Sequence, residues 1–358
     1  MRRLSPDPVR LALIVAGVLA LTPGAPSVAG WVLLIAVPIL LAVSRRRSVR
    51  VAAVLLLLGG AIGLRIALTD NAGSDVLPVT TAAIHRALDG LNPYGFQYSD
   101  STPPGSPFPY GPVALLWYLP LWQHPELIEM GAAIVVSIIL ALEGRLLGLA
   151  VYATAPVVLA SAVDGSNDTS LGLMLLGAFL LAGRWPSIGA GVLGLAVAFK
   201  LSALAFVPVF LAWAGWRAAG SFLTISLIAW APVIWPWQVQ TFVRSLELAE
   251  DTHRNPYSSL GAVIHGLTNG PVDILEPFRL VAGGLTAVAT LRLRRSLDGV
   301  VIAGAIVYLV TLFTGVWASY AYIAALAPVV CWRLDAWLGF TSQPFAWPPR
   351  LLPSALRT

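Results

Sequence analysis

Long apolar stretches alternate with short basic turns along almost the whole of this 358-residue chain. Most stretches have about 15–20 residues and few or no charges, as expected for α-helices that cross the roughly 30 Å hydrocarbon core of a bilayer. The pattern predicts twelve spans, within a range of eleven to thirteen. They cover residues 11–26, 28–44, 51–68, 127–144, 146–163, 168–183, 186–200, 201–215, 219–236, 276–291, 298–315 and 319–338. The segment 112–123 is too short to cross unless it is tilted or extended, and a re-entrant position is the alternative.

The composition excludes an ordinary soluble protein. Hydrophobic residues make up 58% of the chain and charged residues 11%, against about 25% charged in a typical soluble domain. Such a chain has too few polar side chains to cover a surface that faces water, so lipid must be its solvent. We therefore expect an all-α, polytopic transmembrane bundle in which residues 1–358 form one integral-membrane domain. The single cysteine, Cys331, excludes an internal disulfide and a cysteine-based metal site.

Basic residues gather on one side of the predicted bundle. Most of the 22 lysine and arginine residues fall near the two termini or in short turns such as 45–50 and 292–295. The positive-inside rule places these turns and both termini in the cytoplasm. It places two long polar loops, 69–111 and 237–275, outside the cytoplasm, and acidic residues outnumber basic ones in both. We expect a multi-pass protein of the cell membrane, and the net charge of +5 indicates no nucleic-acid partner.

The first outer loop opens with a short helical pattern. Apolar residues recur at helical spacing over 76–88, Ser74 or Asp75 can cap the helix, and Gly90 ends it. One face is apolar and the other polar, so this helix is expected to lie on the outer membrane surface. A carboxylate at its head can act as a general base toward a hydroxyl group, which makes Asp75 a catalytic candidate. The alternative is that Asp75 only caps the helix.

Two motifs follow in the same loop, NPYG at 92–95 and the proline-rich TPPGSPFPYGP at 102–112. The proline-rich run cannot be regular helix or central strand, because its prolines lack backbone donors. Aromatic residues of this stretch can stack on sugar rings, and their spacing alone favours an interfacial aromatic belt. These residues are Tyr94, Phe96, Tyr98, Phe108 and Tyr110.

Polar residues at the outer ends of the spans are candidates for binding a substrate. Lys200 is the only lysine. A lysine in a membrane span is costly, which suggests a site for an anionic group, and the alternative is a side chain that snorkels to the headgroups. Asn167 and Asp168 stand at the start of another span. They can hold sugar hydroxyls or a divalent ion, or serve as a cap and a dipole partner of the helix.

The second outer loop and the last span add three further candidates. The sequence EDTHRNPYSSLG at 250–261 contains the cations His253 and Arg254, which can bind phosphate, although residue chemistry alone favours a solvated loop. Tyr320 falls at the outer face, where it can line a phosphate pocket or anchor the protein at the interface. Nothing in these residues requires a metal or another cofactor, and none is expected.

The order of these features resembles the GT-C superfamily of polyprenyl-phosphate-sugar-dependent glycosyltransferases. Within it, the chain looks most like the mannosyltransferases of actinobacterial cell envelopes. The likeness rests on an acidic residue that opens a loop helix, on G-x-NPY at 90–94, and on PYGP at 109–112. It also rests on G-x-N-D at 165–168 and A-x-K-x-x-A at 198–203.

This resemblance implies an inverting sugar transfer on the extracytoplasmic face. Asp75 matches the general base, which deprotonates an acceptor hydroxyl that attacks the anomeric carbon while polyprenyl phosphate leaves. The leaving phosphate requires cations or helix N-termini nearby, and Lys200 is the first candidate. Mannose is the expected sugar, arabinofuranose is the alternative, and the acceptor is a glycolipid or polysaccharide. A transporter or flippase of lipid-linked sugars and a non-catalytic membrane protein are the alternative functions.

Overall fold

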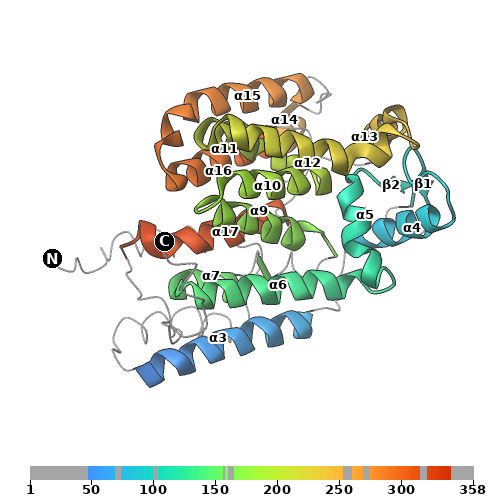
Figure 1. Ribbon diagram of the computed structural model, residues 1–358. Helices are drawn as coiled ribbons and strands as arrows, with labels where there is room; N and C mark the ends of the chain where they lie inside the picture. The colour runs from blue at the N-terminus through green and yellow to red at the C-terminus, as the bar shows by residue number, and fades with distance from the viewer. Residues whose placement is uncertain are drawn as a thin grey trace. The chain divides into compact units, whose positions relative to one another are not determined.

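The computed structural model describes residues 47–68, 74–99, 101, 104–155, 158–159, 165–252, 260–268, 275–314 and 321–339 (Figure 1). Within these ranges it contains fourteen α-helices and a single two-stranded sheet, which confirms the all-α class expected from the sequence. The spans expected at 11–26 and 28–44 lie outside the described residues. So do three candidate site residues, His253, Arg254 and Tyr320.

Each of the other expected spans overlaps a helix. These helices are α3 (Arg47–Leu68), α6 (Pro125–Leu142), α7 (Leu146–Thr154), α9 (Asp168–Ala182), α10 (Pro186–Phe199), η3 (Leu201–Phe206) continued by α11 (Val207–Ala214), α12 (Trp216–Ile234), α15 (Leu275–Thr290), α16 (Leu297–Phe313) and α17 (Ala321–Trp337). The loops carry α4 (Val76–Leu88), α5 (Pro112–Tyr118), η2 (Leu119–Leu121), α13 (Val239–Thr252), α14 (Leu260–Thr268) and η4 (Leu291–Arg295). Strand β1 (Gln97–Tyr98) pairs antiparallel with β2 (Ser106–Pro107), so that Gln97 faces Pro107.

Two predicted segments, 146–163 and 112–123, differ in length from the helices that the structure contains. The span expected at 146–163 is interrupted, because α7 ends at Thr154, and Val158 and Leu159 are helical again. The next residue, Ala155, is extended (φ −64°, ψ 121°), as is favoured before a proline such as Pro156. The doubtful segment 112–123 is helical as α5 and η2, which together extend only about 16 Å, too short to cross a bilayer.

The contacts divide the chain into two compact units. The first contains residues 1–64, 134–156 and 330–358, and the second contains 65–133 and 157–329. In the first unit α7 packs tightly on α17, because a Cβ at Gly148 would overlap the carbonyl oxygen of Cys331. Asp335 of α17 accepts hydrogen bonds from the backbone N–H groups of Leu147 (3.2 Å) and Gly148 (2.9 Å). This carboxylate therefore caps the first turn of α7, whose N–H groups have no acceptor within their own helix.

The second unit is organised around α10, which packs against both α9 and α12 (Figure 1). Glycines permit the close approach: a Cβ at Gly189 would press on the Ala178 carbonyl of α9, and one at Gly194 would press on α12. Because α9 and α10 form a hairpin, the start of one and the end of the other lie at the same end of the unit. This arrangement positions Asp168 beside Lys200.

The basic turns of the second unit lie at the opposite end of these helices. Arg184 follows α9, Arg217 follows the end of α11, and three arginines occupy η4. The end of α9 is close to the start of α16, since a Cβ at Gly183 would lie 3.8 Å from Leu297 Cδ2. Helix α11 also contacts η4. The arginine-rich turns and the polar cluster around Lys200 are therefore separated by the length of the helices.

Candidate functional site

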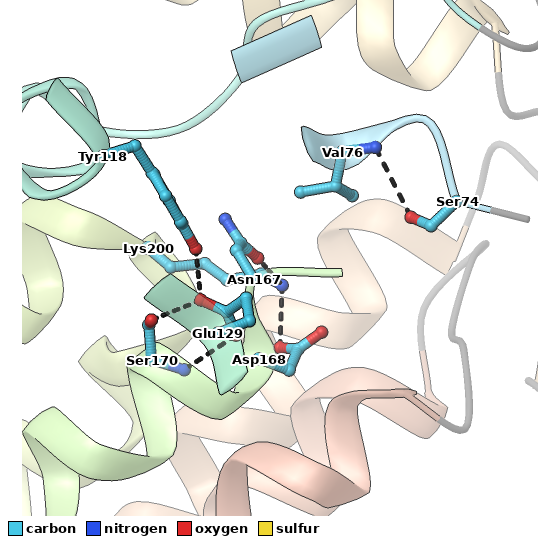
Figure 2. Close-up of polar contacts among 8 residues, drawn as sticks. All are labelled: Ser74, Val76, Tyr118, Glu129, Asn167, Asp168, Ser170 and Lys200. Atoms are coloured by element: carbon cyan, nitrogen blue, oxygen red, sulfur yellow. Dashed lines mark hydrogen bonds and ion pairs between the residues drawn. The ribbon is translucent and has the colours of Figure 1, made fainter. Parts of the chain in front are cut away.

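Lys200 lies at the centre of a buried polar cluster. It follows α10 in an extended conformation (φ −148°, ψ 122°) that ends the helix. Only 8% of the residue is exposed, and Nζ donates to Asn167 Oδ1 at 2.9 Å and to Asp168 Oδ1 at 2.8 Å (Figure 2). The snorkelling interpretation of Lys200 is therefore wrong, because the side chain is buried and paired inside the protein. The opposite charges offset the cost of burying either one alone.

Aromatic rings from two distant segments flank this ion pair. Lys200 Nζ lies 4.5 Å from the ring centroid of Tyr322 in α17 and 5.7 Å from that of Tyr110. Both distances are within the range of cation–π attraction. The structure thus brings Tyr110, Asn167, Asp168 and Lys200, all predicted from the sequence, into one cluster.

The PYGP motif explains how Tyr110 reaches this cluster. The backbone N–H of Gly111 donates to the carbonyl oxygen of Phe199 at 3.1 Å, and this is one of the last carbonyls of α10. A Cβ at position 111 would overlap the carbonyl oxygen of Ala198, so only glycine permits this approach. Pro112 then begins α5, where a missing N–H costs nothing. The motif therefore fastens the loop to the end of α10, next to Lys200.

Asp75 occupies the residue before α4, but its side chain does not cap the helix. No side-chain capping hydrogen bond is made from this position. The Ser74 hydroxyl oxygen instead accepts a hydrogen bond from the Val76 N–H at 3.4 Å (Figure 2). The interpretation of Asp75 as a capping residue is therefore wrong, and the general-base interpretation stays a prediction.

The head of α4 is fastened to the turn that carries the polar cluster. The N–H of Leu77, in the first turn of α4, donates to the carbonyl oxygen of Gly165 at 3.1 Å. Gly165 precedes Asn167 by two residues and adopts a positive φ of 84°, which favours glycine. The G-x-N-D motif thus contacts the helix that Asp75 opens, and it presents Asn167 and Asp168 to Lys200.

The NPYG motif joins the two polar loops to each other. Asn92 Oδ1 accepts from the Tyr94 N–H at 2.9 Å, and its Nδ2 donates to the Trp237 carbonyl at 2.8 Å. The N–H of Gly95 donates to Ser245 Oγ of α13 at 2.7 Å. The loops expected on the same side of the membrane therefore pack on one another (Figure 1).

Most of the aromatic residues of the first loop form a small core of their own. The Tyr94 ring lies 5.3–5.7 Å from the rings of Phe108, Trp237 and Phe242. Tyr98 is buried, and its hydroxyl donates to a backbone carbonyl. Burial raises the pKa of both tyrosine hydroxyls further above its ordinary value, so burial does not favour their ionisation. Tyr94, Tyr98 and Phe108 are covered by protein, so these three rings are neither an interfacial belt nor a surface for stacking sugars. Phe96 is 42% exposed, so both interpretations stay predictions for it, and Tyr110 is the ring that reaches the cluster.

Glu129 of α6 was not among the residues expected from the sequence. It is 2% exposed, and its carboxylate accepts from the Ser170 N–H at 3.0 Å and from the hydroxyls of Ser170 and Tyr118 (Figure 2). Ser170 belongs to the first turn of α9, so its N–H has no acceptor within its own helix. Glu129 therefore caps α9 from a different helix. A lone acidic residue near the start of an expected span was the signal that could have identified it.

Removing this cap should destabilise the protein. We expect Glu129→Ala to lower the free energy of unfolding by about 1–3 kcal/mol, because buried donors of Ser170 and Tyr118 lose their acceptor. Glu129→Gln keeps one acceptor oxygen and should lose less. Thermal unfolding of the purified protein in detergent measures both changes. Glu126→Ala, an exposed position on the same helix, is the matched control, and an equal effect at both positions would refute the cap.

The cluster offers groups that bind oxygen-rich ligands. An amide, a carboxylate and an ammonium group meet beside two aromatic rings, and these groups can donate to or accept from hydroxyl and phosphate oxygens. In the part of the chain that the structure describes, no group of three or more His, Cys, Asp and Glu residues is placed to hold a metal ion. Comparisons of the chain with protein-family models, curated proteins and solved structures found no match.

Proposed function

We propose that this protein is a membrane-embedded, inverting glycosyltransferase. It moves a sugar, expected to be mannose, from a polyprenyl-phosphate carrier to a glycolipid or polysaccharide acceptor outside the cytoplasm. The observation that carries the proposal is the bond between Leu77 and Gly165, which holds the helix opened by Asp75 against the Asn167–Asp168–Lys200 cluster. A candidate base and a group of polyol-binding side chains therefore lie in the same region, at one end of a set of apolar helices.

Exposed apolar side chains support a lipid environment. Among the described helices, α6 and α12 have both the length and the low charge needed to cross a bilayer. On α12, the side chains of Leu223, Leu227 and Ile228 are more than half exposed. The core helix of a soluble protein would bury such residues. Helix α15 exposes Leu280, Val281, Leu285 and Val288 in the same way. A bundle of about twelve spans accounts for these surfaces.

The proposed orientation places the Lys200 cluster and both polar loops outside the cytoplasm. In its support, the two loops pack together through the NPYG motif and α13. The arginine-rich turns lie at the other end of the helices, as the positive-inside rule requires of cytoplasmic turns. Asp75 would then lie near the depth of the sugar–phosphate linkage of a lipid carrier in the outer leaflet.

Cysteine labelling tests this orientation. Ser99→Cys and Glu247→Cys, each in a Cys331→Ser background, should react with a membrane-impermeant thiol reagent in intact cells. Both positions are exposed, whereas the neighbouring Ser245 is fully buried and unsuitable. Arg295→Cys, in an arginine-rich turn, should react only after the cells are permeabilised. The reverse pattern would invert the proposed topology.

In the proposed reaction, different residues activate the acceptor and stabilise the leaving group. The Asp75 carboxylate takes the proton of the acceptor hydroxyl as its oxygen forms a bond to the anomeric carbon. The bond between that carbon and the phosphate oxygen breaks on the opposite face, and polyprenyl phosphate leaves with both electrons. Cations must stabilise the leaving phosphate. His253 and Arg254 of the second loop are proposed for this role, and Tyr320 is proposed to line the same pocket.

Purified protein offers the direct test of the reaction. With a synthetic polyprenyl-phosphate mannose and a membrane glycolipid fraction in detergent, we expect transfer of the sugar in the absence of any ion gradient. A second candidate function, an ion-coupled carrier of lipid-linked sugars, is favoured by the buried Asp168–Lys200 pair and by Glu129, since carriers use such groups as proton relays. Uptake into proteoliposomes that depends on a pH gradient, without product formation, would select the carrier.

A further inference from the structure

The side-chain amide of Asn167 is buried, and its two ends have different partners. Its Oδ1 accepts a hydrogen bond from Lys200 Nζ at 2.9 Å. A lysine ammonium group can only donate, so this bond fixes which end of the amide faces Lys200. Asn167 Nδ2 is buried and has no hydrogen-bond partner among the residues that the structure describes. Figure 2 shows this nitrogen directed away from Lys200 and from the Asp168 carboxylate.

An unpartnered amide nitrogen at a fully buried residue indicates a ligand. Asn167 has an exposed fraction of 0%, and folded proteins supply an acceptor to nearly all buried donors. Gly165, two residues before Asn167, accepts a hydrogen bond from Leu77 in the first turn of α4. The nitrogen therefore lies in the region where the donor of the proposed reaction would have to bind.

The charges around Asn167 favour a neutral acceptor over a phosphate. Lys200 is already neutralised by Asp168 at 2.8 Å, so the described pair offers no excess positive charge to an anion. The ring of Tyr110 stands 5.7 Å from Lys200 Nζ on the loop side of the cluster. A sugar ring presents apolar C–H faces and a rim of hydroxyls, and an aromatic ring beside an amide complements both.

We propose that Asn167 Nδ2 donates a hydrogen bond to a hydroxyl oxygen of the transferred sugar. The Lys200–Asp168 pair holds the amide in the orientation that presents this nitrogen. Asn167 is then a determinant of which sugar is accepted, and the lipid phosphate is bound elsewhere. This inference rests on the proposed function, because it identifies the part of the donor that the cluster recognises.

The test compares the binding of two ligands, polyprenyl-phosphate mannose and the bare polyprenyl phosphate, to the purified full-length protein. The readout is the Kd of each, obtained from ligand-dependent thermal stabilisation. We expect Asn167→Ala to weaken the sugar-bearing carrier about tenfold, as for the loss of one hydrogen bond, and to leave the bare carrier unchanged. Asn167→Asp keeps the oxygen that binds Lys200 but loses the N–H donor, and should reduce the ratio of the two affinities similarly. This second variant keeps the test valid if the alanine variant fails to fold.

Ligand binding and sugar transfer are measured in separate experiments. The role of Asn167 and the proposed reaction can therefore be refuted independently. An unchanged affinity ratio in both variants would overturn the role of Asn167, and so would an equal loss for both ligands, which would indicate a phosphate contact. A parental protein that binds the sugar through Asn167 but transfers none would instead refute the proposed reaction and leave the binding site standing.

Discussion

Asp75→Asn should lower sugar transfer by about 10²–10⁴-fold, the usual contribution of a positioned general base. The substitution preserves size and removes the proton acceptor. Asp75→Ala should lose the same activity. The free energy of unfolding of Asp75→Ala should not fall by the roughly 1 kcal/mol expected when a capping residue is removed. The reason is that the Asp75 side chain makes no capping hydrogen bond. Turnover of a synthetic polyprenyl-phosphate sugar by the purified protein measures the first effect, and thermal unfolding measures the second.

Asp89 provides the matched control for this experiment. It lies at the other end of α4, exposed and paired with His85, so Asp89→Asn should have near-parental turnover. If Asp75→Asn also turned over at the parental rate, Asp75 would not be the base. The search would then move to Asp168, the next carboxylate in the same region.

Lys200→Met should be the most destabilising substitution in the cluster. It leaves the Asp168 carboxylate buried without its counter-charge, and breaking a buried ion pair in this way costs about 3–5 kcal/mol. The double variant Lys200→Met with Asp168→Asn removes both charges and should recover most of this loss. Lys200→Arg keeps the charge but should be less stable than the double variant, because a planar guanidinium does not fit the place of an ammonium. Thermal unfolding in detergent measures all three variants.

The exposed pair Arg244–Glu247 provides the comparison. Arg244→Met removes an ion pair of similar length, 3.1 Å, at the surface. A loss of no more than about 1 kcal/mol is expected there, because solvent screens such charges. A similar small loss for Lys200→Met would mean that water or another cation compensates Asp168, and that the pair does not organise the site.

The helices could be predicted from the sequence, because long runs of apolar residues with few charges are typical of helices. The grouping of Asn167, Asp168 and Lys200 required the structure. Each was a candidate by itself, but only the packing of α9 on α10 shows that the ammonium binds the other two side chains. Glu129 was missed for the same reason. It accepts hydrogen bonds from the N–H and the hydroxyl of Ser170, which is 41 residues away in the sequence.

Local rules failed where two neighbouring residues offered the same chemistry. Ser74 and Asp75 are both good caps, and the backbone geometry of the turn decides between them in favour of the serine. The NPYG motif could be recognised from the sequence. Its partners, Trp237 and Ser245, are about 150 residues away, so no pattern within the first loop could reveal that the motif joins two loops.

The two carboxylate caps, Glu129 on α9 and Asp335 on α7, become available at different times during synthesis of the chain. Glu129 emerges from the ribosome before α9, so the first turn of α9 meets its acceptor as soon as it is made. The acceptor for α7 is Asp335, which follows Gly148 by 187 residues. At about 5–20 residues per second, this delay lasts roughly 10–40 seconds. During that time the start of α7 has no native acceptor, so the contact between α7 and α17 is completed only after α17 has been synthesised.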